Sequence, residues 1–588
     1  MAWNPNDEVS RGRLFKSLEH SYKNLEWARN FVAGIVAEYA GSGFGSGAKQ
    51  KHEILINLLN QAATAATISL VANRPRVKLT TENPGLRPFS KQFELAINNL
   101  IKEIGLENVL RKWVLDAFFC VGIVKVHMAD SGQVQLEQDL WMDPGTPFAS
   151  NVALENWVHD VSATSWEKMQ FAGDWYRLPL AEVQESPIYD QAEAAKLVAT
   201  TKYANEGERL EEIARGAITD QDELEPMVDL CDIWIPKDGV IYTFALDGGG
   251  HFRPKGLPLA QMVWDGPEFG PYKKLAFHDV PENIMPASPA SQISGLARLA
   301  NNLVRKQARK AHRQKDNPIY TPAGTAGAQN AKKASDGEWV QVEDVTQIGQ
   351  VKQGGIDAAT QQFLDWVLAA EDRMAGNVTA KLGLGAQATT VGQEQLIHGA
   401  AAGIEGHMAY RVTEATVSLV RDLAHLLWND RFKTIPARLE IPGADGYSID
   451  ASWTPDDREG SFIDYQFNID IYSMPYLSPQ QRAANLDRLV SKYANLGPLL
   501  MSQGGTINMQ KLVELDAELL NEPRVKELIQ FVGAPIEGDG EEPPMPTSTS
   551  REYVRRSESD QSPQAQSVES QANWAQLASQ QQSEATAA

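Results

Sequence analysis

The sequence is poor in cysteine, has no long apolar run and lacks an excess of positive charge. Its 588 residues include two cysteines, Cys120 and Cys231, which cannot form a disulfide framework and indicate synthesis in a reducing compartment. The longest apolar runs, 62–72 and 117–124, are far shorter than the ~20 residues that a membrane-spanning helix needs, so no membrane partner is expected. A formal net charge of −22 argues against a simple nucleic-acid coating protein, which is normally basic.

Recognisable catalytic and metal-binding motifs are missing as well. The glycine-rich segment GSGFGSGAKQ at 41–50 lacks the Gly-Lys-Ser/Thr ending of a phosphate-binding loop and follows a predicted helix, so it is interpreted as an interhelical loop. The ten histidines show no spacing suited to zinc, and no nucleophile elbow occurs. We therefore predict that the chain is not an enzyme and uses no cofactor or metal.

The residues that are present predict a mixed fold. Apolar residues make up 43% of the chain, enough for a sizeable core. Helical spacing dominates 10–75 and 89–120, whereas 121–128 and the runs between 228 and 280 have the alternation and the Gly and Pro turns of strands. The fold class is therefore predicted as α+β. From residue 536 on, the chain is rich in Pro, Ser, Gln and Glu and predicts a disordered acidic tail.

The charge pattern changes abruptly at Pro286. From Ser288 to Lys315 the chain has no acid and seven Lys or Arg residues, while its apolar positions keep helical spacing. Short strand candidates around a small-residue loop follow, and Asp357 can cap a second helix. A glycine-spaced loop and a long helical run ending at Asn429 come next. This order predicts an antiparallel helix pair with an insertion at its tip.

The order of these elements resembles that of the portal proteins of tailed bacteriophages, the head-to-tail connectors. The resemblance is carried by the helical N-terminus, by FCVGIVKVHM at 119–128, by WMDPGTPFASNVALENWVHDVSATSWEKM at 141–169, and by the series 286–430. It implies a portal-like subunit with an α/β wing, a two-helix stem, a small α/β clip, a long tunnel helix and a helical crown, assembled as an oligomeric ring. The implied divisions are the wing at 1–285, the first stem helix at 286–315, the clip at 316–356, the second stem helix at 357–377, the tunnel loop at 378–390, the long helix and returning wing strands at 391–475, the crown at 476–535 and the tail at 536–588.

The resemblance also implies a function. A portal protein is made in the host bacterial cytoplasm and forms a ring, of twelve copies, at one capsid vertex of the virion. The ring is a conduit for double-stranded DNA during packaging and ejection, and it docks the terminase large subunit and then head–tail adaptor or tail proteins. The major capsid protein and a scaffolding protein are further implied partners. Two alternatives stay open from the sequence: an acidic cytosolic enzyme of unrecognised class, or another virion structural protein such as a capsid or tail component.

The candidate functional residues lie in three segments. Cations of the first stem helix could face DNA, or could instead complement the helix dipole and pair with Glu371 and Asp372 of a neighbouring subunit. The tunnel loop has one charge among glycines that permit movement, and a plain linker is its alternative. The clip cations face DNA or a partner, or are simply exposed. The candidates are Arg305, Lys306, Arg309, Lys310 and Arg313 for the DNA channel, Lys381, Gly383, Gly385, Gln387 and Thr389 for the tunnel loop, and Lys332, Lys333 and Trp339 for docking at the clip.

Overall fold

The structure is a computed structural model, and the residues that it describes all belong to one unit, Met1–Glu527. The predicted tunnel loop, crown and tail lie outside the described residues. The described residues are 4–41, 56–71, 73–128, 134–137, 140–142, 146–200, 224–248, 252–264, 266, 270–322, 325–334, 339, 341, 344, 346, 348–353, 355–376, 391–429, 435–440, 448–453, 458–469 and 474.

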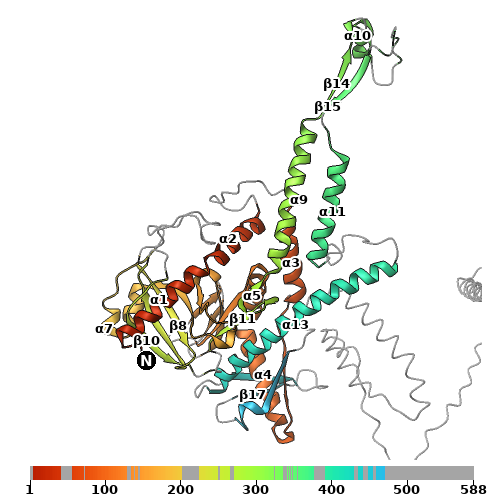
Figure 1. The fold of residues 1–588 in the computed structure, drawn as a ribbon. Helices are drawn as coiled ribbons and strands as arrows, with labels where there is room; N and C mark the ends of the chain where they lie inside the picture. The colour runs from red at the N-terminus through yellow and green to blue at the C-terminus, as the bar shows by residue number, and fades with distance from the viewer. Residues whose placement is uncertain are drawn as a thin grey trace, which may run out of the picture. The chain divides into compact units, whose positions relative to one another are not determined.

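Runs of helices and runs of strands follow one another along the chain, and the predicted α+β class is confirmed (Figure 1). None of the described helices is both long enough and apolar enough to cross a membrane. The helices are α1 Glu8–Asn24, α2 Glu26–Ala40, α3 Leu58–Leu70, α4 Arg87–Glu103, α5 Leu106–Phe119, α6 Leu180–Glu185, α7 Gln191–Ala194, α9 Pro289–His312, α10 Thr325–Lys333, α11 Ala358–Met374 and α13 Val391–Asn429. The strands are β1 Val77–Thr81, β2 Gly122–Met128, β3 Val134–Glu137, β4 Leu140–Met142, β5 Pro147–Val152, β6 Trp157–His159, β7 Ala172–Pro179, β8 Met227–Ile235, β9 Val240–Leu246, β10 Pro254–Val263, β11 Tyr272–Leu275, β12 His278–Val280, β13 Asn283–Ala287, β14 Lys315–Tyr320, β15 Ile348–Gln353, β16 Ile435–Glu440, β17 Ser448–Trp453 and β18 Tyr465–Ile469.

Two antiparallel sheets form the centre of the N-terminal part. One has five strands in the order β10-β9-β8-β7-β6, and the other has three in the order β11-β2-β5. Helix α1 packs on the five-stranded sheet through Leu14 and Leu18, and Phe15 meets Phe244 edge to face at 5.2 Å between ring centroids. Helix α5 covers β2 and β5 of the smaller sheet, with Trp113 fully buried. Burial of these apolar faces supplies the main driving force for folding this part of the chain.

Later segments of the chain complete this N-terminal core. Strand β18 pairs antiparallel with β1, so that Val77 lies opposite Ile469. The C-terminal half of α13 is buried in the same core, where Asp422 forms an ion pair with Lys273 of β11 at 2.6 Å. The α13 side chains in the core include Val412, Leu419, Val420, Leu423 and Leu427.

Helices α9 and α11 form an antiparallel pair that the strand pair β14–β15 connects (Figure 1). The Ser288 side chain caps α9, with Pro289 in its first turn, and the Asp357 side chain caps α11. Apolar side chains fill the space between the two helices, and the Gln307 amide donates to the Asp357 backbone carbonyl at 3.0 Å. The contacts between the helices are made by Leu296, Leu299, Ala300, Leu303, Val304, Leu364, Val367 and Leu368.

One segment between these helices differs from the sequence-based expectation. The sequence predicts a small-residue loop that includes Lys332 and Lys333, but residues 325–333 form helix α10. Its sequence, TAGAQNAKK, contains no proline or β-branched residue after Thr325, and alanine, glutamine and lysine are good helix formers. The sequence did not predict this helix because it contains a glycine and has no row of apolar residues at helical spacing.

Candidate functional site

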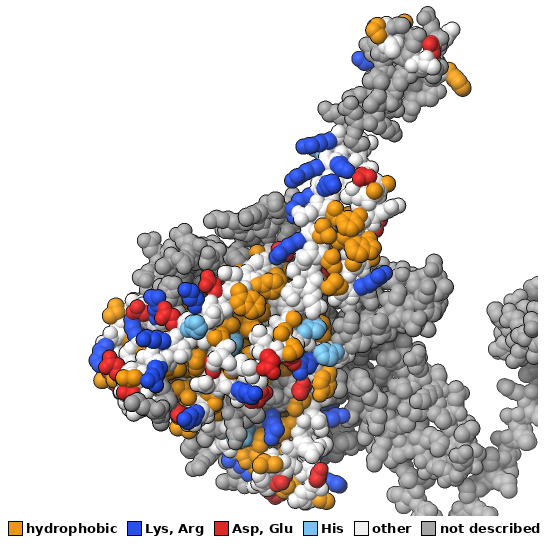
Figure 2. Space-filling view, in the orientation of Figure 1, with side chains coloured by type: hydrophobic (Ala, Val, Ile, Leu, Met, Phe, Trp, Pro, Cys, Tyr) orange, Lys and Arg blue, Asp and Glu red, His pale blue; other side chains and the backbone are white. Residues whose placement is uncertain are grey.

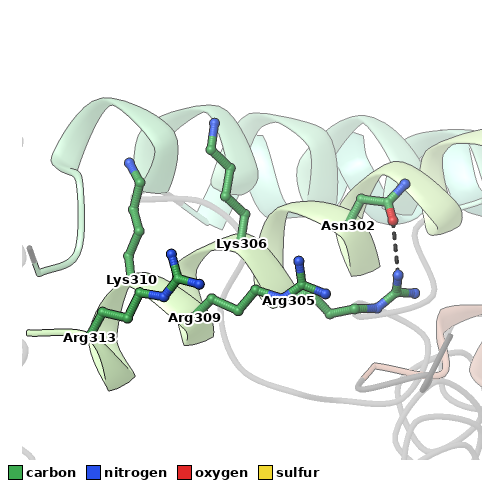
Figure 3. A pocket seen from close by; sticks show the side chains of 6 residues that line it. All are labelled: Asn302, Arg305, Lys306, Arg309, Lys310 and Arg313. Carbon is green, nitrogen blue, oxygen red and sulfur yellow. Dashed lines mark hydrogen bonds between the residues drawn. The ribbon is translucent and has the colours of Figure 1, made fainter.

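Five cations lie along the C-terminal half of α9 and its C-cap, Arg313. Arg305, Arg309 and Arg313 follow one another at four-residue spacing on one face, and Lys306 and Lys310 lie beside them (Figure 3). Together with Asn302 they line a shallow hollow of about 320 Å³. We call these five residues the basic row. All members of the basic row are exposed or half-exposed, because the opposite face of α9 packs against α11.

Two members of the basic row contact side chains among the residues that the structure describes. Arg305 donates to the Asn302 amide oxygen at 3.0 Å, and Lys310 pairs with Asp357 at 3.4 Å. A hydrogen bond from Thr360, together with Lys310, holds the pKa of Asp357 below its usual range. Lys306 and Arg309 form no ion pair with any residue that the structure describes, nor does Arg313. The row therefore presents a surplus of positive charge at the end of a helix whose dipole also favours cations.

Arg298, the first cation of α9, belongs to a different contact. It pairs with Glu38 of α2 at 2.5 Å, near the N-terminal part of the chain. The basic row thus begins after Arg298, at Arg305.

The acids proposed as partners for these cations in a neighbouring subunit are not equally available. Glu371 lies on the face of α11 that packs toward α9, and only 5% of it is exposed. Burial, and Asp372 beside it, raise the pKa of Glu371 to about 7. Glu371 is therefore poorly placed to pair with a cation of a neighbouring subunit, since its spacing from Leu364 and Val367 puts it on the buried face of α11.

We expect Glu371→Gln to raise the free energy of unfolding by about 1–3 kcal/mol at pH 8 and by a small fraction of that at pH 5. The native pKa of about 7 exceeds the 4.5 of an unperturbed glutamate, so the unfolded chain loses the proton first as the pH rises. Burial of Glu371 therefore costs nothing at low pH and costs increasingly more up to about pH 7. Thermal unfolding followed by circular dichroism at both pH values measures the difference. Asp365→Asn, at an exposed site on the same helix, is the control and should shift stability equally little at both.

Helix α11 also exposes a pair of aromatic side chains. Phe363 and Trp366 stack on each other with ring centroids 5.9 Å apart and planes 11° apart. They are 46% and 61% exposed, although they lie next to the buried residues Leu364 and Val367. Figure 2 shows apolar side chains on this helix pair next to the Lys and Arg side chains. Exposed aromatic clusters of this kind commonly mark protein–protein contacts.

The remaining candidates from the sequence are separated from the basic row in the chain. Lys332 and Lys333 occupy the last turn of α10 and are exposed, and Trp339 is 99% exposed. The tunnel-loop candidates Lys381, Gly383, Gly385, Gln387 and Thr389 lie outside the described residues. The structure thus gathers the five stem candidates into one row, and it leaves the clip candidates exposed beyond the helix pair.

Sequence reasoning missed a buried ion cluster between the two sheets. The Lys125 ammonium of β2 donates to Asp174 of β7 and to Asp232 of β8, at 2.7 Å each. The Tyr272 hydroxyl donates to Asp174 at 2.5 Å, and Thr243 donates to Asp232 at 2.7 Å. Burial opposes charge on all three groups, but the two carboxylates raise the pKa of Lys125 above its usual value. A lysine inside the apolar strand GIVKVHM was the one local signal of this cluster.

Neither a metal site within the described residues nor a match to known proteins identifies the function of the chain. In the described ranges, no group of three or more His, Cys, Asp or Glu side chains is arranged to hold a metal ion. Neither models of known protein families nor curated proteins give a match to this chain. The basic row and the exposed aromatic pair are therefore the features that bear on function.

Proposed function

We propose that this chain is the subunit of a bacteriophage portal ring, a conduit for double-stranded DNA at one vertex of the capsid. The observation that carries the proposal is the basic row, an exposed line of five cations on α9 in a chain whose net charge is −22. A row of cations on the surface of a strongly acidic chain is suited to contact with a polyanion. Lys and Arg contacts with DNA phosphates are independent of sequence, as a conduit requires.

The balance of charge also suits movement of the DNA. Each phosphate neutralised by Lys or Arg releases counterions and adds affinity, so a uniformly basic channel would bind DNA tightly and stall it. A short basic row within acidic surroundings gives contacts that form and break quickly. The proposed subunit therefore guides DNA without gripping it, and the force for packaging comes from a separate motor.

The exposed aromatic pair supports assembly of the ring. Phe363 and Trp366 are on the helix that packs against the basic helix, so contact between copies through this face would bring successive α9 helices near each other. A face that meets a different face of the next copy generates a closed ring when the rotation between copies closes. We propose a ring of about twelve copies, as the resemblance implies.

The other partners follow from the same proposal. The clip, with Lys332, Lys333 and Trp339, docks the terminase large subunit and later the head–tail adaptor or tail proteins. The major capsid protein surrounds the ring, with a scaffolding protein during assembly, and the assembled subunit belongs to the virion. The chain itself performs no catalysis in this proposal.

Electron microscopy of the purified chain in negative stain tests ring formation. We expect rings with a central hole for the unmodified protein. Trp366→Glu should lower the fraction of rings at least about tenfold, because it places a charge in an apolar contact that is repeated around the ring. Trp27→Glu is a matched control, since Trp27 of α2 is 58% exposed against 61% for Trp366. A uniform monomer under all conditions of salt and concentration would contradict the proposal.

A further inference from the structure

A cavity of about 350 Å³ lies beside the buried ion cluster, between the two sheets. It is partly open to solvent, and β2, β5, β7, β8 and the 3₁₀ turn Leu154–Asn156 supply its lining. The charged lining consists of Lys125, Asp174 and Asp232. The cavity is therefore polar and has the size of a site for a small molecule or a single side chain.

The charges that face the cavity do not cancel. Two carboxylates, Asp174 and Asp232, meet one ammonium, that of Lys125. Burial, with Lys125 nearby, lowers the pKa of His127 to about 3, so this histidine on the cavity wall is neutral at pH 7. With both carboxylates ionised, the half-open cavity holds a surplus of one negative charge, and burial beside Asp232 raises the pKa of Asp174 because this surplus is unfavourable.

The hydrogen bonds show where the surplus lies. Both oxygens of Asp232 have donors, because Oδ1 accepts from Tyr176 and Thr243 and Oδ2 accepts from Lys125. In Asp174, Oδ1 accepts from both Lys125 and Tyr272. Oδ2 of Asp174 has no hydrogen-bond partner among the described residues, although the side chain is only 9% exposed. Asp174 lines the cavity, so this oxygen is free to accept a hydrogen bond from a donor that enters the cavity.

We propose that this cavity binds a small organic cation through an ammonium or guanidinium group that donates to Asp174 Oδ2. Such a group supplies both the missing hydrogen-bond donor and the missing positive charge. A divalent metal ion fits less well, because it needs several oxygen ligands and Lys125 already occupies one oxygen of each carboxylate at 2.7 Å. The same cationic group can come from a free amine or guanidine, or from a Lys or Arg side chain of another protein. The proposal does not depend on the ring.

Calorimetric titration of the full chain with methylguanidinium chloride and propylammonium chloride tests the site. We expect saturable binding of one cation per chain. Tetramethylammonium, a cation of similar size without N–H donors, should bind at least about tenfold more weakly. A capped Gly-Arg-Gly peptide distinguishes the two sources: affinity at least about tenfold above that of methylguanidinium indicates a protein side chain, and equal or lower affinity indicates a free cation. Absence of saturable binding for every N–H cation and for the peptide would overturn the proposal.

Two variants locate the binding, and a third is the control. Asp174→Asn removes the charge with little change of shape and should weaken binding at least about tenfold. If this variant does not fold, Ala153→Phe decides the question, because it fills the rim of the cavity while every member of the ion cluster stays in place. Asp247→Asn removes an exposed carboxylate that pairs with Lys255 on the same sheet, and it should leave binding unchanged. Unchanged binding in Ala153→Phe would place the cation elsewhere and refute the site.

Discussion

Replacement of Arg305 and Arg309 together by glutamate is expected to lower DNA packaging roughly tenfold or more while rings still form. Both side chains lie on the face of α9 that points away from α11, so the change leaves the contacts between the two helices in place. The substitution replaces two positive charges by two negative charges in every subunit. A ring repeats this change around the channel, so that weak attraction of the DNA backbone becomes repulsion.

Packaging of a defined DNA with purified ring, motor and capsid components measures this effect, and negative-stain images of the same preparations establish that rings are present. Arg305→Lys with Arg309→Lys is the matched control, because non-specific phosphate contacts depend on charge more than on the shape of the cation. It should package close to the unmodified level. Full packaging by the glutamate variant, with rings intact, would remove the basic row from the DNA path.

The helix pair that carries the basic row could be predicted because its signals are local. Helix α9 lies within the range predicted for the first stem helix, and its boundary is marked by Ser288 as the cap and Pro289 in the first turn. Asp357 marks the start of α11 in the same way. A run of cations without acids is also a local feature, so both the helix and the character of its surface can be read from consecutive residues.

The features that the sequence did not reveal depend on contacts between distant segments. The pairing of β1 with β18 and the ion cluster of Lys125, Asp174 and Asp232 join residues that no spacing rule connects. With 76 acids in the chain, two particular aspartates carried no information. Glu371 is different, because its three- and four-residue spacing from the apolar positions of α11 already indicated burial. The helical spacing of Glu371 predicted a buried position, although a glutamate is seldom buried.

The largest expected effect on stability comes from Lys125→Met. This variant should lose about 3–5 kcal/mol of the free energy of unfolding at pH 7, because it leaves Asp174 and Asp232 close together without a counter-ion. Methionine has a similar length and fills the same volume, so the loss reports on charge more than on packing. Urea unfolding followed by tryptophan fluorescence measures it, since Trp175 and Trp234 lie on strands of the adjoining sheet. Lys255→Met, which removes an exposed partner of Asp247, is the control and should change stability by less than about 1 kcal/mol.

The dependence of the Lys125→Met deficit on pH separates the electrostatic cause from a packing defect. In the unmodified protein burial raises the pKa of Asp174, whereas Lys125 holds that of Asp232 below 3.8. Without the ammonium, burial and mutual repulsion should raise the native pKa of both aspartates above the unfolded value. The deficit is then complete above the raised native pKa and shrinks as the pH falls, because both states become protonated. The triple variant Lys125→Met, Asp174→Asn, Asp232→Asn should recover much of the loss at pH 7, since no buried charge is left unpaired. A deficit of equal size at pH 4 and pH 7, or a triple variant no more stable than the single one, would mean that Lys125 holds the two sheets together through its packing and not through its charge.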